Sequence, residues 1–201
     1  EVLIFTNTSK VWRFNTRGDY WVLDISSGRL TKLGKGLPAQ SLMFAKFSPD
    51  GKKCAYVSEH NLFAEDLSTN LVQKLTTDGT RKFINGTFDW VYEEEIYGRG
   101  QKQAYWWSPD SSRIAFLQID DSPVRAYITL DDIPYDPTVE RWDYPRAGDP
   151  NPIVKLGVVP VTGAPPAWVD TSKYPADDRL IVRVGWTPDS RQVAFEVENR
   201  T

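Results

Sequence analysis

The sequence predicts an all-β protein that forms part of a β-propeller, and three observations support this prediction. Aromatic residues make up 13% of the 201 residues and occur with 14 prolines and 13 glycines, a composition typical of short strands and tight turns. One ten-residue pattern occurs three times, and a second pattern recurs at the spacing of one propeller blade. We expect about three to four blades of a larger propeller, with a short helical insertion and a long β-hairpin arm.

The first repeat starts at Phe47, Trp107 and Trp186 and continues for ten positions without gaps. Each copy runs from an aromatic residue through Ser/Thr-Pro-Asp to an alanine that is followed by another aromatic residue. Proline presets φ at the second position of a turn, and Asp followed by Gly or Ser continues the change of chain direction. The pattern therefore predicts three β-hairpins. The alternative is a generic β-sandwich with similar turns, which three gapless copies disfavour.

The second repeat relates residues 24–33 to residues 66–75 at an offset of 42 residues. One four-stranded propeller blade takes about 40–45 residues, so this offset indicates a blade. A closed propeller needs about four to eight blades, more than this chain supplies. We therefore expect residues 1–201 to be a fragment of a longer protein.

The copies of the hairpin pattern are 60 and then 79 residues apart, so each interval holds more than one blade. We expect the first insertion near residues 83–103, around three consecutive glutamates. The second is expected near residues 122–152, a stretch rich in Tyr, Pro and Asp that is typical of a long hairpin arm.

Composition excludes several functional classes. No apolar run approaches the roughly 18 residues of a membrane-spanning helix. The net charge is −3 and no basic stripe is present, so nucleic acid is not an expected partner. Cys54 is the single cysteine, which excludes an intrachain disulfide, and we expect it to be buried in a strand. His60 is the single histidine, so neither a metal site nor a cofactor is expected.

The acidic segment at residues 87–95 admits two interpretations. Thr87 or Asp89 is placed to cap a short helix, and acidic residues in a first turn complement the helix dipole, which makes a solvated helix start one possibility. However, adjacent carboxylates repel one another, and Trp90 and Tyr92 flank them as anchors. The second interpretation is a receptor for an ammonium ion, whose charge-assisted hydrogen bonds two carboxylates can share.

Three motifs in order carry a resemblance to a known family. They are VWR at residues 11–13, DWVYEEE at residues 89–95, and YPRAG at residues 144–148 followed by NPIVK at residues 151–155. In order and approximate separation they resemble the propeller of dipeptidyl peptidase IV and its relatives in the prolyl oligopeptidase group. The resemblance covers almost the whole chain.

This resemblance implies an N-terminal propeller followed by a C-terminal α/β-hydrolase domain that is absent from this chain. It also implies a serine exopeptidase that releases N-terminal dipeptides with Pro or Ala at the second position. Carried over by position, Glu94 and Glu95 bind the α-ammonium group of the substrate. Arg13 contacts the first carbonyl of the substrate and holds the glutamates in place, whereas Glu93 has no direct role.

The same resemblance names the expected partners. They are peptides with a free N-terminus, the C-terminal hydrolase domain, and a second copy of the chain bound through the arm between Tyr135 and Pro152. It favours a secreted or periplasmic protein.

The chain itself offers no catalytic residue. It contains no Gly-x-Ser-x-Gly segment, and its single histidine leaves a Ser-His-Asp triad without a base. Two other functions remain open: a non-catalytic relative whose propeller and arm serve protein association, and an unrelated scaffolding propeller with solvated acidic turns.

Overall fold

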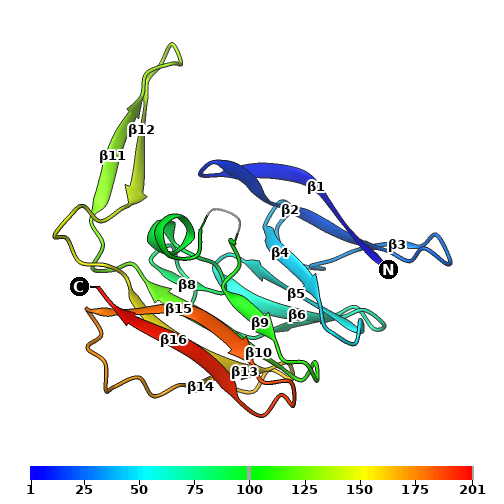
Figure 1. Cartoon of the computed structure of the whole chain (residues 1–201). Helices are drawn as coiled ribbons and strands as arrows, with labels where there is room; N and C mark the ends of the chain where they lie inside the picture. Colours follow the sequence, from blue (N-terminus) through cyan, green and yellow to red (C-terminus); the bar gives the residue numbers. More distant parts are fainter. Residues whose placement is uncertain (99–100, 201) are drawn as a thin grey trace.

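The computed structural model describes residues 1–98 and 101–200, and its strands form antiparallel sheets (Figure 1). The largest sheet has seven strands. Their order is β1 (Val2–Val11), β2 (Phe14–Leu23), β4 (Leu42–Phe47), β5 (Lys53–Ser58), β6 (Asn61–Asp66) and β7 (Leu71–Lys74), with β3 (Leu30–Lys32) paired to β2.

The second sheet has five strands in the described part of the chain. Their order is β14 (Ala167–Trp168), β13 (Ile153–Pro160), β10 (Arg113–Asp120) and β8 (Phe83–Asn85), with β9 (Tyr105–Trp107) also paired to β10. Two further pairs are β11 (Ala126–Asp131) with β12 (Thr138–Asp143), and β15 (Arg179–Trp186) with β16 (Val193–Asn199). The prediction of an all-β fold is confirmed.

All three copies of the first repeat form the predicted hairpins, β4–β5, β9–β10 and β15–β16. In each turn the Ser or Thr hydroxyl donates to the Asp carboxylate at 2.6 Å. The residue after Asp, which is Gly51, Ser111 or Ser190, has a positive φ of 61–72°. The Ser111 and Ser190 hydroxyls also accept the backbone N–H of Asp50 and Asp110, so each turn is bonded to the next copy.

The second repeat forms the β2–β3 and β6–β7 turns. Asp24 accepts the backbone N–H of Ser26 at 2.9 Å, and Asp66 accepts the backbone N–H of Ser68 at 3.0 Å. The two turns have the same geometry because the same Asx chemistry closes each of them.

The core lies between the sheets. One apolar cluster joins Val57 and Leu62 of the first sheet to Ile114, Phe116 and Val159 of the second. A second cluster packs β10 and β13 against β15 and the helical insertion. The strand β10 is buried on both faces from Ile114 to Ile119, and all of these residues except Gln118 are apolar. Cys54 is fully buried, as predicted.

The first predicted insertion, residues 83–103, begins with β8, which pairs with β10 in the second sheet. It also contains the π-helical turn η1 (Tyr92–Ile96), which lies between β8 and β9 in the chain; residues 99 and 100 of this insertion fall outside the described residues. The second is the β11–β12 hairpin, which projects away from the sheets as an arm (Figure 1). In the described residues no helix has the length and apolarity needed to cross a membrane.

Candidate substrate-recognition site

Asp89 starts the helical turn. Its Oδ2 accepts the backbone N–H of Val91 and its Oδ1 accepts that of Tyr92, each at 3.1 Å. Capping by Asp was one of the two sequence predictions, and Thr87 instead pairs with Gln103 in a β-bridge. Burial of Asp89 raises the pKa of its carboxyl to about 6.

The three consecutive glutamates have different surroundings. The buried Glu93 forms an ion pair with Lys102, with 3.5 Å between the carboxylate and Nζ. The carboxylate of Glu94 is 3.1 Å from Nε of Arg13, and the Glu94 side chain is only 5% exposed. Glu95 is exposed and lines an open hollow that Tyr144 also lines. Successive residues of a helical turn point in different directions, so the three glutamates face three different surroundings.

Arg13 reaches Glu94 from a two-residue turn at the end of the β1–β2 ribbon. The strands pair up to Val11 and Phe14, which leaves Trp12 and Arg13 as the turn. Trp12 has a φ of 53°, a conformation that usually requires glycine. The tight turn projects Arg13 toward η1, where its side chain remains half exposed.

Trp90 is the common contact of the three motifs that carry the family resemblance. Its ring lies 5.7 Å from that of Trp12 and 5.8 Å from that of Tyr144, both in edge-to-face geometry. The guanidinium of Arg13 is 5.5 Å from the centre of the same ring. Segments far apart in the sequence thus meet around one indole, which fixes the approach of Arg13 to η1.

Lys102 supports the same turn from the other side. Its Nζ lies 3.4 Å from the centre of the Phe14 ring while it pairs with Glu93. Burial raises the pKa of Glu93, and Lys102 opposes that shift. The family resemblance gave Glu93 no direct role. In the structure Glu93 forms an ion pair with Lys102. No local sequence pattern predicted Lys102 as its partner.

The structure therefore brings Arg13 and Glu94 into direct contact. Glu95 is the next residue of η1 and is exposed to solvent. This arrangement is compatible with binding a cation at Glu94 and Glu95, but the binding of a substrate there stays a prediction.

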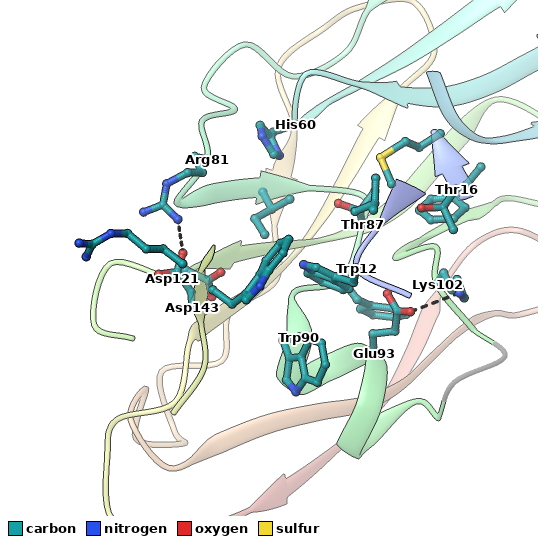
Figure 2. A pocket seen from close by; sticks show the side chains of 17 residues that line it. Trp12, Thr16, His60, Arg81, Thr87, Trp90, Glu93, Lys102, Asp121 and Asp143 are labelled. Atoms are coloured by element: carbon teal, nitrogen blue, oxygen red, sulfur yellow. Dashed lines mark hydrogen bonds and ion pairs between the residues drawn. The ribbon is translucent and has the colours of Figure 1, made fainter. Parts of the chain in front are cut away.

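A cavity of about 230 Å³ adjoins this turn, and sequence reasoning missed it (Figure 2). Trp12, Trp90 and Glu93 line one part of it, and Asp121 and Asp143 line another. These side chains come from separate β-strands, loops and η1, so no spacing along the chain pointed to them. His60 occupies the predicted turn and also lines the cavity, and burial lowers the pKa of its imidazole.

A family model, curated relatives and a solved structure each match all or nearly all of this chain. The family model described as the dipeptidyl peptidase IV N-terminal region matches residues 1–201. A probable dipeptidyl-aminopeptidase B of Ajellomyces dermatitidis is 32% identical over 217 residues, which cover 100% of this chain and 23% of the relative. Its namesake in Aspergillus oryzae is 31% identical over 206 residues, covering 96% of this chain and 23% of the relative.

The fold is similar to the crystal structure of Porphyromonas gingivalis dipeptidyl peptidase 4. The TM-score is 0.87 at 29% sequence identity, and the match covers 98% of this chain and 28% of that chain. Together with the antiparallel sheets, this match confirms the predicted part of a β-propeller. The chain spans about a quarter of the length of the proteins it matches.

Proposed function

This chain belongs to the family of dipeptidyl peptidase IV N-terminal regions, and on that premise we propose that it is the substrate-recognition part of a serine exopeptidase. The proposed enzyme releases N-terminal dipeptides with Pro or Ala at the second position. The names of the relatives, which are dipeptidyl peptidases, support a peptidase. The observation that carries the assignment of the site is the ion pair between Arg13 and Glu94 at the surface of η1.

In this proposal Glu94 and Glu95 accept hydrogen bonds from the α-ammonium group of the peptide. A free α-amino group has a pKa of about 7.7–8.0, and nearby carboxylates favour its charged form. Arg13 contacts the first carbonyl of the peptide and holds Glu94 in position. The half exposure of Arg13 supports this role, because part of its guanidinium remains available to a ligand.

A peptide held at its N-terminus reaches a nucleophile at a fixed distance. Two carboxylates on a short, capped turn would then select the bond after the second residue, and fixed placement lowers the entropic part of the barrier. The nucleophile belongs, in this proposal, to a C-terminal α/β-hydrolase domain of the same protein. A secreted or periplasmic location is part of the same proposal.

The test is turnover of a chromogenic Xaa-Pro substrate by the full-length protein. We expect Glu94→Gln and Glu95→Gln each to lower kcat/KM at least tenfold while the thermal transition is retained. The matched control is Glu196→Gln, which removes one charge from an exposed ion pair with Arg183. Wild-type turnover in both glutamate variants would contradict the site. No turnover by the wild-type protein would favour the non-catalytic relative or the scaffolding propeller.

We also propose that the arm joins two copies of the protein. Its exposed apolar side chains support this proposal: Ile128, Leu130, Ile133, Tyr135 and Val139. Ile133 is 92% and Tyr135 fully exposed, an arrangement more typical of a contact surface than of a monomer. Light scattering should show a dimer that the double variant Ile133→Asp/Tyr135→Asp converts to a monomer; a wild-type monomer would contradict the proposal.

A further inference from the structure

The walls of the cavity beside η1 combine aromatic and ionisable side chains (Figure 2). Trp12, Trp90 and Trp142 line it together with Phe44 and Phe88. The Trp12 ring lies 5.7 Å from that of Trp90 and 6.5 Å from that of Trp142, both in edge-to-face geometry. Aromatic faces attract cations within about 6 Å, because the ring quadrupole is negative at the face.

Asp121 lines the same cavity and has an unusual environment. The residue is only 4% exposed, and its Oδ1 is buried without a hydrogen-bond partner among the described residues. A buried carboxylate oxygen normally accepts a hydrogen bond, since an unpaired one carries the full cost of desolvation. The described residues supply no hydrogen-bond donor to this oxygen, so a ligand could provide one.

The neighbouring charged groups already form hydrogen bonds with other partners. Lys82 has three N–H donors, which bond to the backbone carbonyls of Asp121 (2.9 Å) and Val124 (3.0 Å) and to Asp143 (2.5 Å). Arg81 bonds the second oxygen of Asp143 at 2.6 Å. Asp89 uses both of its oxygens to accept the backbone N–H groups of Val91 and Tyr92. Lys82 is also close enough to Asp121 to favour its charged form, but Oδ1 of Asp121 still receives no hydrogen bond from this group.

The other ionisable groups of the cavity do not reach Asp121 either. Glu93 and Lys102 pair with each other, and Arg141 is exposed on β12. Burial holds the imidazole of His60 toward its neutral form by lowering its pKa. Burial and repulsion from Asp89 and Asp143 raise the pKa of Asp121, and the positive charge of Lys82 opposes that rise.

We propose that this cavity binds a primary alkylammonium group, with Asp121 as its acceptor and the tryptophan faces around its alkyl chain. An ammonium ion supplies the missing donor and adds a positive charge beside the carboxylate. A divalent metal ion fits less well, because no three His, Cys, Asp or Glu side chains in the described residues are placed to hold one. The volume of about 230 Å³ suits a short alkyl chain.

The test is isothermal titration calorimetry of the full-length protein with n-butylammonium and with n-butanol, its neutral counterpart. We expect saturable binding of n-butylammonium, at least tenfold tighter than that of n-butanol. Asp121→Asn should weaken binding at least tenfold, and Trp142→Leu severalfold. The control Glu196→Gln removes a carboxylate that pairs with Arg183 and does not line the cavity, and it should change the affinity less than twofold.

The thermal transition separates binding from folding. Above pH 8 Asp121→Asn removes a buried carboxylate whose Oδ1 has no donor, so at that pH its Tm should not fall below that of the wild-type protein. If Asp121→Asn does unfold, a severalfold weakening in a folded Trp142→Leu variant still supports the cavity, and unchanged affinity in that variant would overturn it. Absence of saturable binding in the wild-type protein would overturn the proposal.

The same titration distinguishes this cavity from the proposed peptide site, on which the inference does not rest. Glu94→Gln and Glu95→Gln should leave the affinity for n-butylammonium within twofold. If those variants abolish binding while Asp121→Asn does not, the probe sits at the glutamates. That result would overturn the cavity proposal and support the proposed function.

Discussion

Nε of Arg13 lies 3.1 Å from Oε1 of Glu94, and this contact joins the turn of the β1–β2 ribbon to the helical turn η1. The Glu94 side chain is nearly buried, whereas the Arg13 side chain is half exposed. The pair therefore has one fixed member and one member that solvent or a ligand can reach. The proposed recognition of a peptide N-terminus depends on this asymmetry.

The free energy of this ion pair should be modest, because Arg13 is partly solvated. A double-mutant cycle with Arg13→Met and Glu94→Gln is expected to give a coupling of about 1 kcal/mol in the free energy of unfolding. The same cycle at the more exposed Arg183–Glu196 pair should give about 0–0.5 kcal/mol. Urea unfolding of the four variants of each pair measures both couplings. Equal couplings would contradict the expectation that burial of Glu94 strengthens its pair with Arg13.

Trp12 should position Arg13 through its ring rather than through its backbone. Glycine tolerates the φ of 53° at this position, so Trp12→Gly keeps the turn while it removes the contacts with Trp90 and Trp142. We expect KM for Xaa-Pro substrates to rise severalfold in the full-length enzyme and kcat to change less. A wild-type KM would show that the ring contacts do not matter for Arg13.

Lys82 ties both ends of the arm to the second sheet. It bonds Asp121 and Val124, where the chain enters the arm, and Asp143, where the chain leaves it. Lys82→Met keeps the length of the side chain but loses all three bonds, so unfolding should become easier by about 1–3 kcal/mol. Lys35→Met, at an exposed lysine, is the control and should cost less than about 0.5 kcal/mol.

Asp121 should make stability depend on pH. Its pKa is raised to about 8 by burial and by the nearby Asp89 and Asp143, against about 3.9 in an unfolded chain. The folded state therefore binds the proton more tightly, so the contribution is complete below about pH 4 and is lost as pH rises through 8. Wild-type Tm minus that of Asp121→Asn should fall between pH 5 and pH 8. A difference that is constant with pH would refute this expectation.

Local patterns were sufficient to predict most of the fold. Ser-Pro-Asp turns place Pro and a positive φ where the hairpin needs them, so the hairpins at Ser48, Ser108 and Thr187 could be predicted from chemistry within ten residues. The cap at Asp89 was predictable for the same reason, since its side chain bonds the backbone two and three residues ahead.

Contacts between distant segments could be predicted only where the family resemblance named them. It placed Arg13 beside the glutamates, and the structure has Arg13 at Glu94. It did not indicate Lys102 or the unpaired oxygen of Asp121. These features depend on how separate strands pack, and no periodicity within one segment encodes that packing.

The most direct test of the account compares two peptides that differ only at the N-terminus. The full-length wild-type protein is given an Xaa-Pro peptide with a free α-amino group and its N-acetylated counterpart, and kcat/KM is measured for each near neutral pH. Recognition of the ammonium by Glu94 and Glu95 predicts that acetylation lowers kcat/KM at least a hundredfold, because the charge and its hydrogen bonds are lost. Equal cleavage of the two peptides would contradict the central claim.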